Sequence, residues 1–388
     1  MSLNEPNDAQ RDAAPPAQPN ASERDIKASR AHTARHLLTT SQLRQSLLIT
    51  PPPSVRIATI AGFQAGLAIL VALLTVHLSP WSHMVGYPAL GGLAALFGRY
   101  ASLQHRRRIV AISGALLVAG VFFTSLASYA GVSPGLMVLL LALSAGLYTL
   151  AVSHWGLVGG PGAVIFVFAV GASLGQVDSL GMLLERTVAT SWGALVAWIV
   201  CALTDRLRPH GMFMPPPPSG PISHQLIVAA RITAGAAMAA LITYWAGWQY
   251  PAWAAIGAAA VMQGTHLHLT MNRSLQRMAG TVIGACIVWI ILAQNPSFWT
   301  VMIAVVAFQI ITEIVIGYNY ALGQIAITPM ALLMTHLASP VASSNMPGER
   351  VFDTIVGAAI GVIFAVIFST VDDRIYLARR HGKLKARR

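Results

Sequence analysis

The chain has 388 residues, of which 55% are hydrophobic and 10% are charged, and its formal net charge is +12. Soluble domains carry about 25% charged residues, so this composition excludes an ordinary soluble protein and indicates one that lies in a lipid bilayer. Nearly all of the basic residues fall on one side of the apolar segments. We therefore attribute the positive charge to membrane topology and expect no nucleic acid partner.

Residues 1–50 are predicted to form a disordered N-terminal arm. This segment is first rich in Pro, Ala and Asp and then polar and basic, and it contains no apolar stretch like the centre of a signal peptide. We therefore expect the first membrane helix to direct insertion.

Twelve apolar segments follow, six in a first membrane repeat at 51–204 and six in a second at 222–371. Several are long enough to cross about 30 Å of hydrocarbon as α-helix. The first six are 57–78, 84–98, 109–129, 135–153, 156–175 and 187–204, and the second six are 225–247, 250–265, 278–293, 298–317, 321–338 and 351–370. Residues 205–221 are predicted to be a Pro-rich cytoplasmic linker, and residues 372–388 a basic cytoplasmic tail.

The two groups of six repeat the same landmarks. Tyr87-Pro88 recurs as Tyr250-Pro251 after 163 positions, and Glu185-Arg186 recurs as Glu349-Arg350 after 164. A repeat of this length indicates duplication of a whole six-helix unit. The sequence therefore predicts an all-α integral membrane protein of two parallel six-helix repeats, with about 12 transmembrane helices.

The distribution of basic residues predicts the orientation. With the N-terminus inside, 23 of the 25 Lys and Arg residues fall on the cytoplasmic side, including Arg99, and only Arg186 and Arg350 fall outside. This asymmetry follows the positive-inside rule and places both termini in the cytoplasm. We expect a multi-pass protein of the plasma membrane, which is the inner membrane if the source is a Gram-negative bacterium.

Two motifs resemble a known family. Residues 277–284, Arg-Met-Ala-Gly-Thr-Val-Ile-Gly, resemble the Arg-x-x-Gly-Thr-x-x-Gly stretch of the fusaric acid resistance protein-like family, which includes aromatic acid exporters. Residues 350–357, Arg-Val-Phe-Asp-Thr-Ile-Val-Gly, look like the final helix of that family, and plant aluminium-activated malate transporters are similar at a greater distance. The resemblance implies an efflux protein for organic, often aromatic, carboxylates. The chain lacks the large cytoplasmic domain found between the halves of many such exporters.

Interrupted apolar segments at matching places of two repeats indicate a substrate pathway, because irregular backbone at membrane depth needs protein or water beside it. The second segments contain Pro88 and Pro251, and the fifth segments contain Gly159 and Gly323. We predict that these residues lie along the pathway. The alternative is a set of kinked packing helices.

Arginines are expected to form an anion-attracting mouth on the cytoplasmic side. Arg107, Arg108 and Arg277 precede the third segments, where a guanidinium and free backbone N–H groups together can bind a carboxylate. Arg56 and Arg231, near the starts of the first segments, extend this predicted funnel. The alternative is cytoplasmic charge that faces lipid headgroups.

Glu313 lies well inside an apolar segment, and Thr149 stands at the matching position of the first half. A buried carboxylate is costly unless it is paired or protonated, so Glu313 is a candidate for proton coupling. The alternative is a protonated structural residue.

Arg186 and Arg350 are the candidate outer gate. Each follows a glutamate that fits the first turn of a helix, so simple helix capping is the alternative. No residues show the spacing of a metal site or a catalytic group, so we expect no enzyme activity, no metal and no cofactor.

These observations together predict a transporter that exports organic anions, chiefly aromatic carboxylates, in exchange for protons. A passive organic-anion channel and a non-transporting accessory or assembly protein remain the alternatives. The expected partners are the lipid bilayer, small organic anions and protons as counter-ion, and a homodimer remains open.

Overall fold

The computed structural model describes residues 37, 44, 46, 48, 49, 51–157, 159–208, 221–263, 267–338 and 345–369. Within these residues the protein contains twelve α-helices, three short 3-10 helices and no strand. Most of the predicted N-terminal arm, residues 209–220 of the predicted linker and the predicted C-terminal tail lie outside the described residues.

The helices of the first half are α4 (Val55–His77), α5 (Gly86–Gly92), α6 (Leu103–Tyr129), α7 (Pro134–His154), α8 (Val164–Ala172) and α9 (Leu180–Thr204). Those of the second half are α10 (Ile222–Trp245), α11 (Pro251–Met262), α12 (Leu267–Leu292), α13 (Phe298–Val315), α14 (Tyr320–Ala338) and α15 (Met346–Ile367). The 3-10 helices η2 (Ser82–Met84) and η3 (Leu93–Leu96) flank α5, and η4 (Asp205–Leu207) follows α9.

Nine of the described helices are long and apolar enough to cross a bilayer, and α5, α8 and α11 are shorter. This set of helices confirms the prediction of an all-α, multi-pass membrane protein. α4 illustrates how the sequence builds such a helix. The Ser54 side chain accepts a hydrogen bond from the backbone N–H of Ile57 at 3.3 Å and caps the start. Ala65 and Ala68 are fully buried, whereas Phe63 is 59% exposed, as expected of a helix with one face on the bundle and one on lipid.

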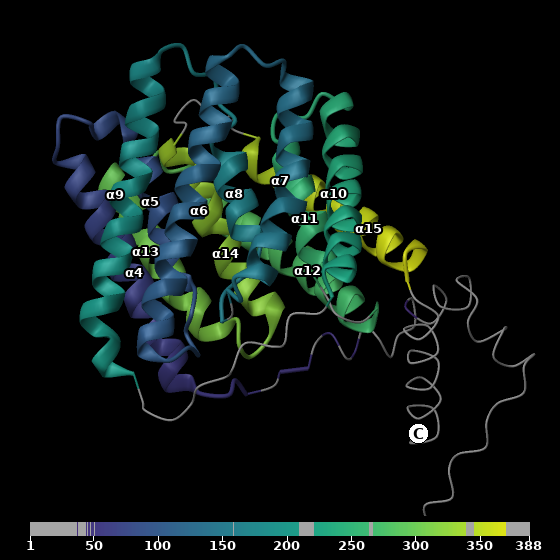
Figure 1. The fold of residues 1–388 in the computed structure, drawn as a ribbon, viewed down its shortest axis with the longest axis horizontal. Helices are drawn as coiled ribbons and strands as arrows, with labels where there is room; N and C mark the ends of the chain where they lie inside the picture. The colour runs from purple at the N-terminus through teal and green to yellow at the C-terminus, as the bar shows by residue number, and fades with distance from the viewer. Residues whose placement is uncertain are drawn as a thin grey trace, which may run out of the picture.

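The helices form one bundle in which the halves pack along two seams (Figure 1). Between the halves, α4 packs on α13 and α10 packs on α7, while α5 contacts α14 and α11 contacts α8. Within the halves, α9 packs on α5 and α6, and α15 packs on α11 and α12. Each of these contacts has a counterpart made by helices at the matching places of the chain. The duplication itself and the orientation of the termini stay predictions.

The short second helices approach the sixth helices closely because glycines lie between them. A Cβ added to Gly193 would overlap the carbonyl group of Pro88, and one added to Gly357 would overlap the carbonyl oxygen of Ala254. Inside a bilayer the hydrophobic effect does not drive helices together, because lipid tails are as apolar as the side chains. Small residues that allow close backbone contact therefore stabilise helix packing.

Several predicted boundaries differ from the structure. α6 and α12 begin before the predicted residues 109 and 278, because hydropathy locates the apolar part of a helix and misses polar turns that continue it. As a result, Arg277 lies ten residues after the first residue of α12 and not at a helix start. The predicted segment 156–175 contains helix only from Val164 to Ala172. Gly159 and Gly162 have φ of 71° and 76°, which a helix cannot contain.

Candidate functional site

A buried ion pair between Arg99 and Glu313 joins the two halves. Arg99 follows η3, and Glu313 lies near the end of α13; their side chains are 12% and 4% exposed. The Arg99 Nη2 atom donates to Glu313 Oε2, and its Nε atom donates to the carbonyl oxygen of Gly159 at 3.1 Å. Arg99 thus connects the end of the short second helix, the loop before α8 and an acid of the other half.

Two turns bring these groups together. Phe97 is extended and Gly98 has φ of 74°, so the chain leaves η3 abruptly and presents Arg99 at the helix end. Gly159 also has a positive φ, and a Cβ added there would lie 3.1 Å from the Arg99 backbone nitrogen. Glycine is therefore needed at Gly159 both for the backbone angle and for the close approach of the chain to Arg99.

Glu313 lies on the seam between α4 and α13. A Cβ added to Gly62 of α4 would lie 3.3 Å from the Cβ of Glu313, so the two helices are nearly in backbone contact there. A buried ion pair contributes little net stability, but removal of either partner leaves an uncompensated charge. An anion that replaced Glu313 at Arg99 would satisfy the guanidinium and leave Glu313 without a cation.

A second buried network lies next to Arg99 and joins α4, α6 and η4. Arg106 is fully buried, and it donates to Asp205 Oδ1 at 2.7 Å and to Gln64 Oε1 at 2.6 Å. Arg208 donates to Asp205 at 3.2 Å and to the carbonyl oxygens of Arg99 and Ala101 at 3.0 and 2.7 Å. Burial lowers the pKa of Arg208, and the charge of Arg106 lowers it further. The start of the predicted linker is thus part of the protein core.

The five arginines of the predicted funnel differ in exposure. Arg56, Arg107 and Arg108 are exposed, Arg231 is half-buried and Arg277 is 2% exposed. On α6 the side chain that faces the core is that of the neighbouring Arg106, whereas Arg107 and Arg108 face outward. The predicted position of Arg277 at a helix start was wrong, because α12 begins at Leu267. A role of Arg107, Arg108 and Arg277 in anion binding stays a prediction.

The candidate outer-gate arginines lie over aromatic rings. The guanidinium of Arg186 is 5.3 Å from the centre of the Tyr87 ring, and that of Arg350 is 5.3 Å from the centre of the Trp253 ring. Arg186 also donates to the carbonyl oxygens of Gly175 and Gln176 at 2.9 and 2.8 Å. Both rings belong to second segments, beside the buried Pro88 and Pro251. Gly323 lies inside α14 and packs on Ile316.

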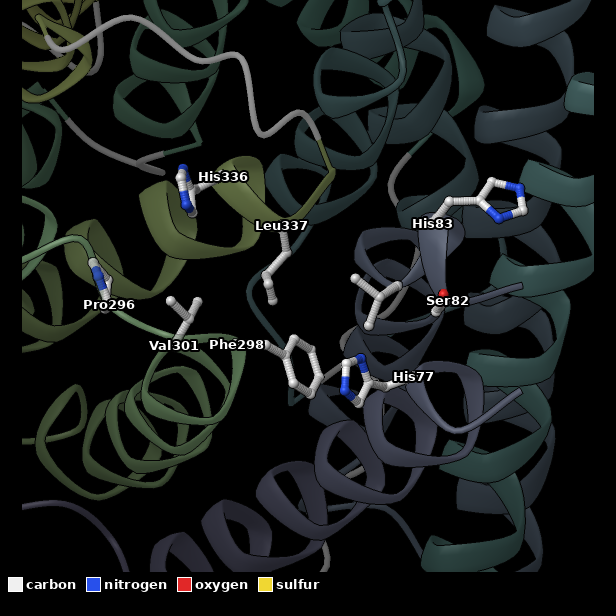
Figure 2. A pocket seen from close by; sticks show the side chains of 9 residues that line it. His77, Ser82, His83, Pro296, Phe298, Val301, His336 and Leu337 are labelled. Carbon is white, nitrogen blue, oxygen red and sulfur yellow. The ribbon is translucent and has the colours of Figure 1, made fainter. Parts of the chain in front are cut away.

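A cavity of about 380 Å³ lies at the other end of the α4–α13 seam from Glu313. His77 at the end of α4 stacks on Phe298 at the start of α13, with ring centres 3.7 Å apart, and Figure 2 shows both rings at the cavity together with His83 and His336. The remaining lining residues are Ser82, Val85, Pro296, Val301 and Leu337. The His83 ring also contacts Glu185 Oε2 at 3.0 Å. Within the described part of the chain, no three His, Cys, Asp or Glu residues are grouped as metal ligands.

The sequence identified Glu313 as an unusual acid but did not identify its partner. The charge pattern places Arg99 among the cytoplasmic residues, and no sequence pattern distinguishes Gln64, Arg106 or Asp205. One signal was present: Arg99 directly follows a short second segment, and a solitary acid in an apolar helix needs a nearby cation. The assignment of Glu313 to proton coupling stays a prediction.

These features define a multi-pass α-helical membrane protein with buried charges at its helix breaks. Residues 237–364 match the family described as fusaric acid resistance protein-like, which confirms the resemblance seen in the motifs at Arg277 and Arg350. A stretch of 112 residues is 35% identical to the uncharacterized membrane protein YvaC of Bacillus subtilis, and it covers 29% of this chain and 18% of that relative. No solved structure matches the chain. The family match supports a membrane transporter-like role in general.

Proposed function

We propose that the protein exports organic anions, chiefly aromatic carboxylates, across the plasma membrane in exchange for protons. The observation that supports this proposal is the buried Arg99–Glu313 pair at the contact of the two halves. Arg99 binds the substrate carboxylate, and Glu313 carries the proton. The resemblance to aromatic acid exporters supports the substrate class, and the predicted topology places the pair near the cytoplasmic side.

The chemistry of exchange follows from competition between two carboxylates. A substrate carboxylate offers Arg99 the same oxygens as Glu313 does, and guanidinium groups bind such oxygens strongly. Once it has lost Arg99, the buried Glu313 carboxylate has no cation, so its protonated form becomes favoured. Anion binding at Arg99 and proton uptake at Glu313 therefore accompany one another.

Export by antiport requires that the proton comes from the outer side. While the anion occupies Arg99, Glu313 takes a proton through the α4–α13 seam. The cavity lined by His77, His83 and His336 lies at the end of this seam that is predicted to face outward. When the anion leaves outward, Glu313 returns to Arg99 and releases its proton to the cytoplasm. One anion then leaves for each proton that enters.

The test uses purified protein in liposomes and measures uptake of radiolabelled benzoate into vesicles oriented inside out. We expect a pH gradient with an acidic lumen to drive accumulation by the natural protein. Glu313→Gln abolishes this coupling, whereas Asp178→Asn, at an exposed acid that bonds Gln176, retains it. Matching elution profiles on size exclusion establish that both variants fold.

Each other outcome identifies an alternative function. A benzoate current that follows voltage and ignores the pH gradient would establish a passive anion channel. Absence of both flux and current for benzoate and for a panel of other carboxylates would overturn the transport function and favour an accessory protein.

A further inference from the structure

Buried polar side chains line a column between α12, α14 and α15 in the second half. Six residues define this polar column, and each is at most 2% exposed. They are Arg277, Thr281, Gln324, Arg350, Asp353 and Thr354. At least one side-chain nitrogen or oxygen of every member is buried without a hydrogen-bond partner, including both carboxylate oxygens of Asp353.

The three helices hold these side chains close together. α12 packs on both α14 and α15, and a Cβ added to Gly280 would lie 2.5 Å from the Cβ of Gln324, so the chain beside Thr281 touches α14. Arg277 Nη1 donates to the Tyr320 hydroxyl at 3.1 Å. The charges of Arg277 and Asp353 both act on Arg350, so the arginines of α12 and α15 lie within electrostatic reach.

Burial of these groups without water or ligand lowers the stability of the folded protein. Each buried polar group without a partner costs about 1–3 kcal/mol, and buried charges cost more. Two guanidinium groups share the column with one carboxyl group, so positive charge is in excess. A membrane protein tolerates this arrangement where water or an anionic ligand supplies the missing partners.

The first half bonds two of the matching positions, at Arg186 and Thr190, and thereby provides a control. Arg186, which matches Arg350, donates to two backbone carbonyl oxygens. Thr190, which matches Thr354, donates to the carbonyl oxygen of Arg186 at 2.8 Å, and Ala189 stands where the second half has Asp353. Arg106 on the matching helix is paired with Asp205. Single buried atoms also lack partners in the first half, among them Arg106 Nε and Arg186 Nε. The unpaired carboxylate of Asp353 and the unpaired hydroxyl of Thr354 have no counterpart at the matching positions 189 and 190 of the first half.

We propose that the polar column of the second half is the carboxylate-binding track of the transporter, with Arg277 and Arg350 as its two cationic positions. This inference rests on the proposed export function and extends it, because it assigns the path to one half of the molecule. The hydroxyl and amide groups of Thr281, Gln324 and Thr354 replace water around the anion between the arginines.

The test compares two threonines at matching places, both fully buried. Thr354→Cys and Thr190→Cys are introduced separately after replacement of Cys201 and Cys286 by Ala. A negatively charged methanethiosulfonate reagent is then applied with and without benzoate. We expect the cysteine at 354 to react, to react much faster than the one at 190, and to be protected by benzoate. Equal reaction rates, no reaction at 354 or no protection by benzoate would each overturn the inference.

A second measurement separates this inference from the proposed function. Thr354→Val keeps the shape of the side chain and removes its hydroxyl group, and we expect it to raise the KM for benzoate uptake about fivefold, the effect of one lost hydrogen bond, with kcat little changed. Thr190→Val, whose hydroxyl bonds only to its own helix, leaves the KM unchanged. If both variants transport like the natural protein, the track is wrong and export stands. If the natural protein transports no carboxylate, export itself is wrong.

Discussion

Arg106 donates a hydrogen bond to Asp205 Oδ1 at 2.7 Å, and the two side chains are 0% and 2% exposed. Asp205 also accepts from Arg208, so one carboxylate compensates two guanidinium groups. Because Arg208 donates to the backbone of Arg99 and Ala101, this network fixes the loop that carries the Arg99–Glu313 pair. The structural arginine cluster of the first half thus supports the site proposed for anion binding.

Removal of the shared carboxylate is expected to destabilise the protein strongly. Asp205→Ala leaves Arg106 and Arg208 buried without an anion, so we expect a loss of about 3–5 kcal/mol in the free energy of unfolding. Thermal unfolding of the detergent-solubilised protein measures the change. Asp178→Ala is the control, because Asp178 is exposed and bonds only Gln176; its effect is expected within about 0.5 kcal/mol. Equal melting temperatures for the two variants would contradict the assigned role of Asp205.

The contact between Gly193 and Pro88 gives a second stability prediction. In Gly193→Ala the added methyl group overlaps the carbonyl group of Pro88, so α5 and α9 must separate. Overpacking of this kind costs about 1–3 kcal/mol or more, and we expect lower yield and a lower Tm. Gly181→Ala on the same helix is the matched control, because the nearest atom, Ser179 Oγ, lies 3.7 Å away. That variant is expected to match the natural protein or exceed it in stability.

The fold class was predictable because long apolar segments have few alternatives in a bilayer. The ends of helices were less predictable, since α12 continues through polar residues before its apolar part and the loop before α8 depends on the backbone angles of Gly159 and Gly162. Hydropathy indicates which segments are apolar enough to lie in the membrane. It does not indicate where the backbone hydrogen bonds of a helix begin and end.

The candidate site was predictable only in part, for a different physical reason. Glu313 is unusual by its chemistry alone, so the sequence identified it. Its contact with Arg99 spans 214 positions of the chain and depends on how the two halves pack. The burial of Arg106 and Arg277 likewise depends on which helix face meets a neighbour. Neither property follows from local composition.

The orientation of the protein can be tested with single cysteines in loops, after replacement of Cys201 and Cys286. Asn295→Cys lies between α12 and α13 and is predicted to be outside, so an impermeant maleimide applied to intact cells should label it. Ser102→Cys, before α6, is predicted to be cytoplasmic and should react only after permeabilisation. Both positions are exposed, so accessibility is matched. The reverse labelling pattern would place Arg99 and Glu313 near the outer surface and would remove the proposed direction of export.

The Arg99–Glu313 pair predicts non-additive effects on stability. Arg99→Gln leaves the Glu313 carboxylate, which is only 4% exposed, without a cation, and we expect it to cost about 3–5 kcal/mol. Glu313→Gln is expected to cost less, because Arg99 is more exposed and keeps its hydrogen bond to the Gly159 carbonyl oxygen. The double variant removes both charges, so it should be more stable than Arg99→Gln alone. The measured coupling should lie between about 0.5 and 3 kcal/mol.

Transport by the same three variants separates the structural role of the pair from the functional one. If the pair only holds the loop after η3 against α13, benzoate uptake should recover in the double variant together with the Tm. If Arg99 binds the anion and Glu313 carries the proton, uptake driven by a pH gradient stays lost in all three, because neutral side chains supply neither group. Recovery of gradient-driven uptake in a stable double variant would therefore reduce the pair to a structural contact and leave the polar column as the remaining candidate for anion binding.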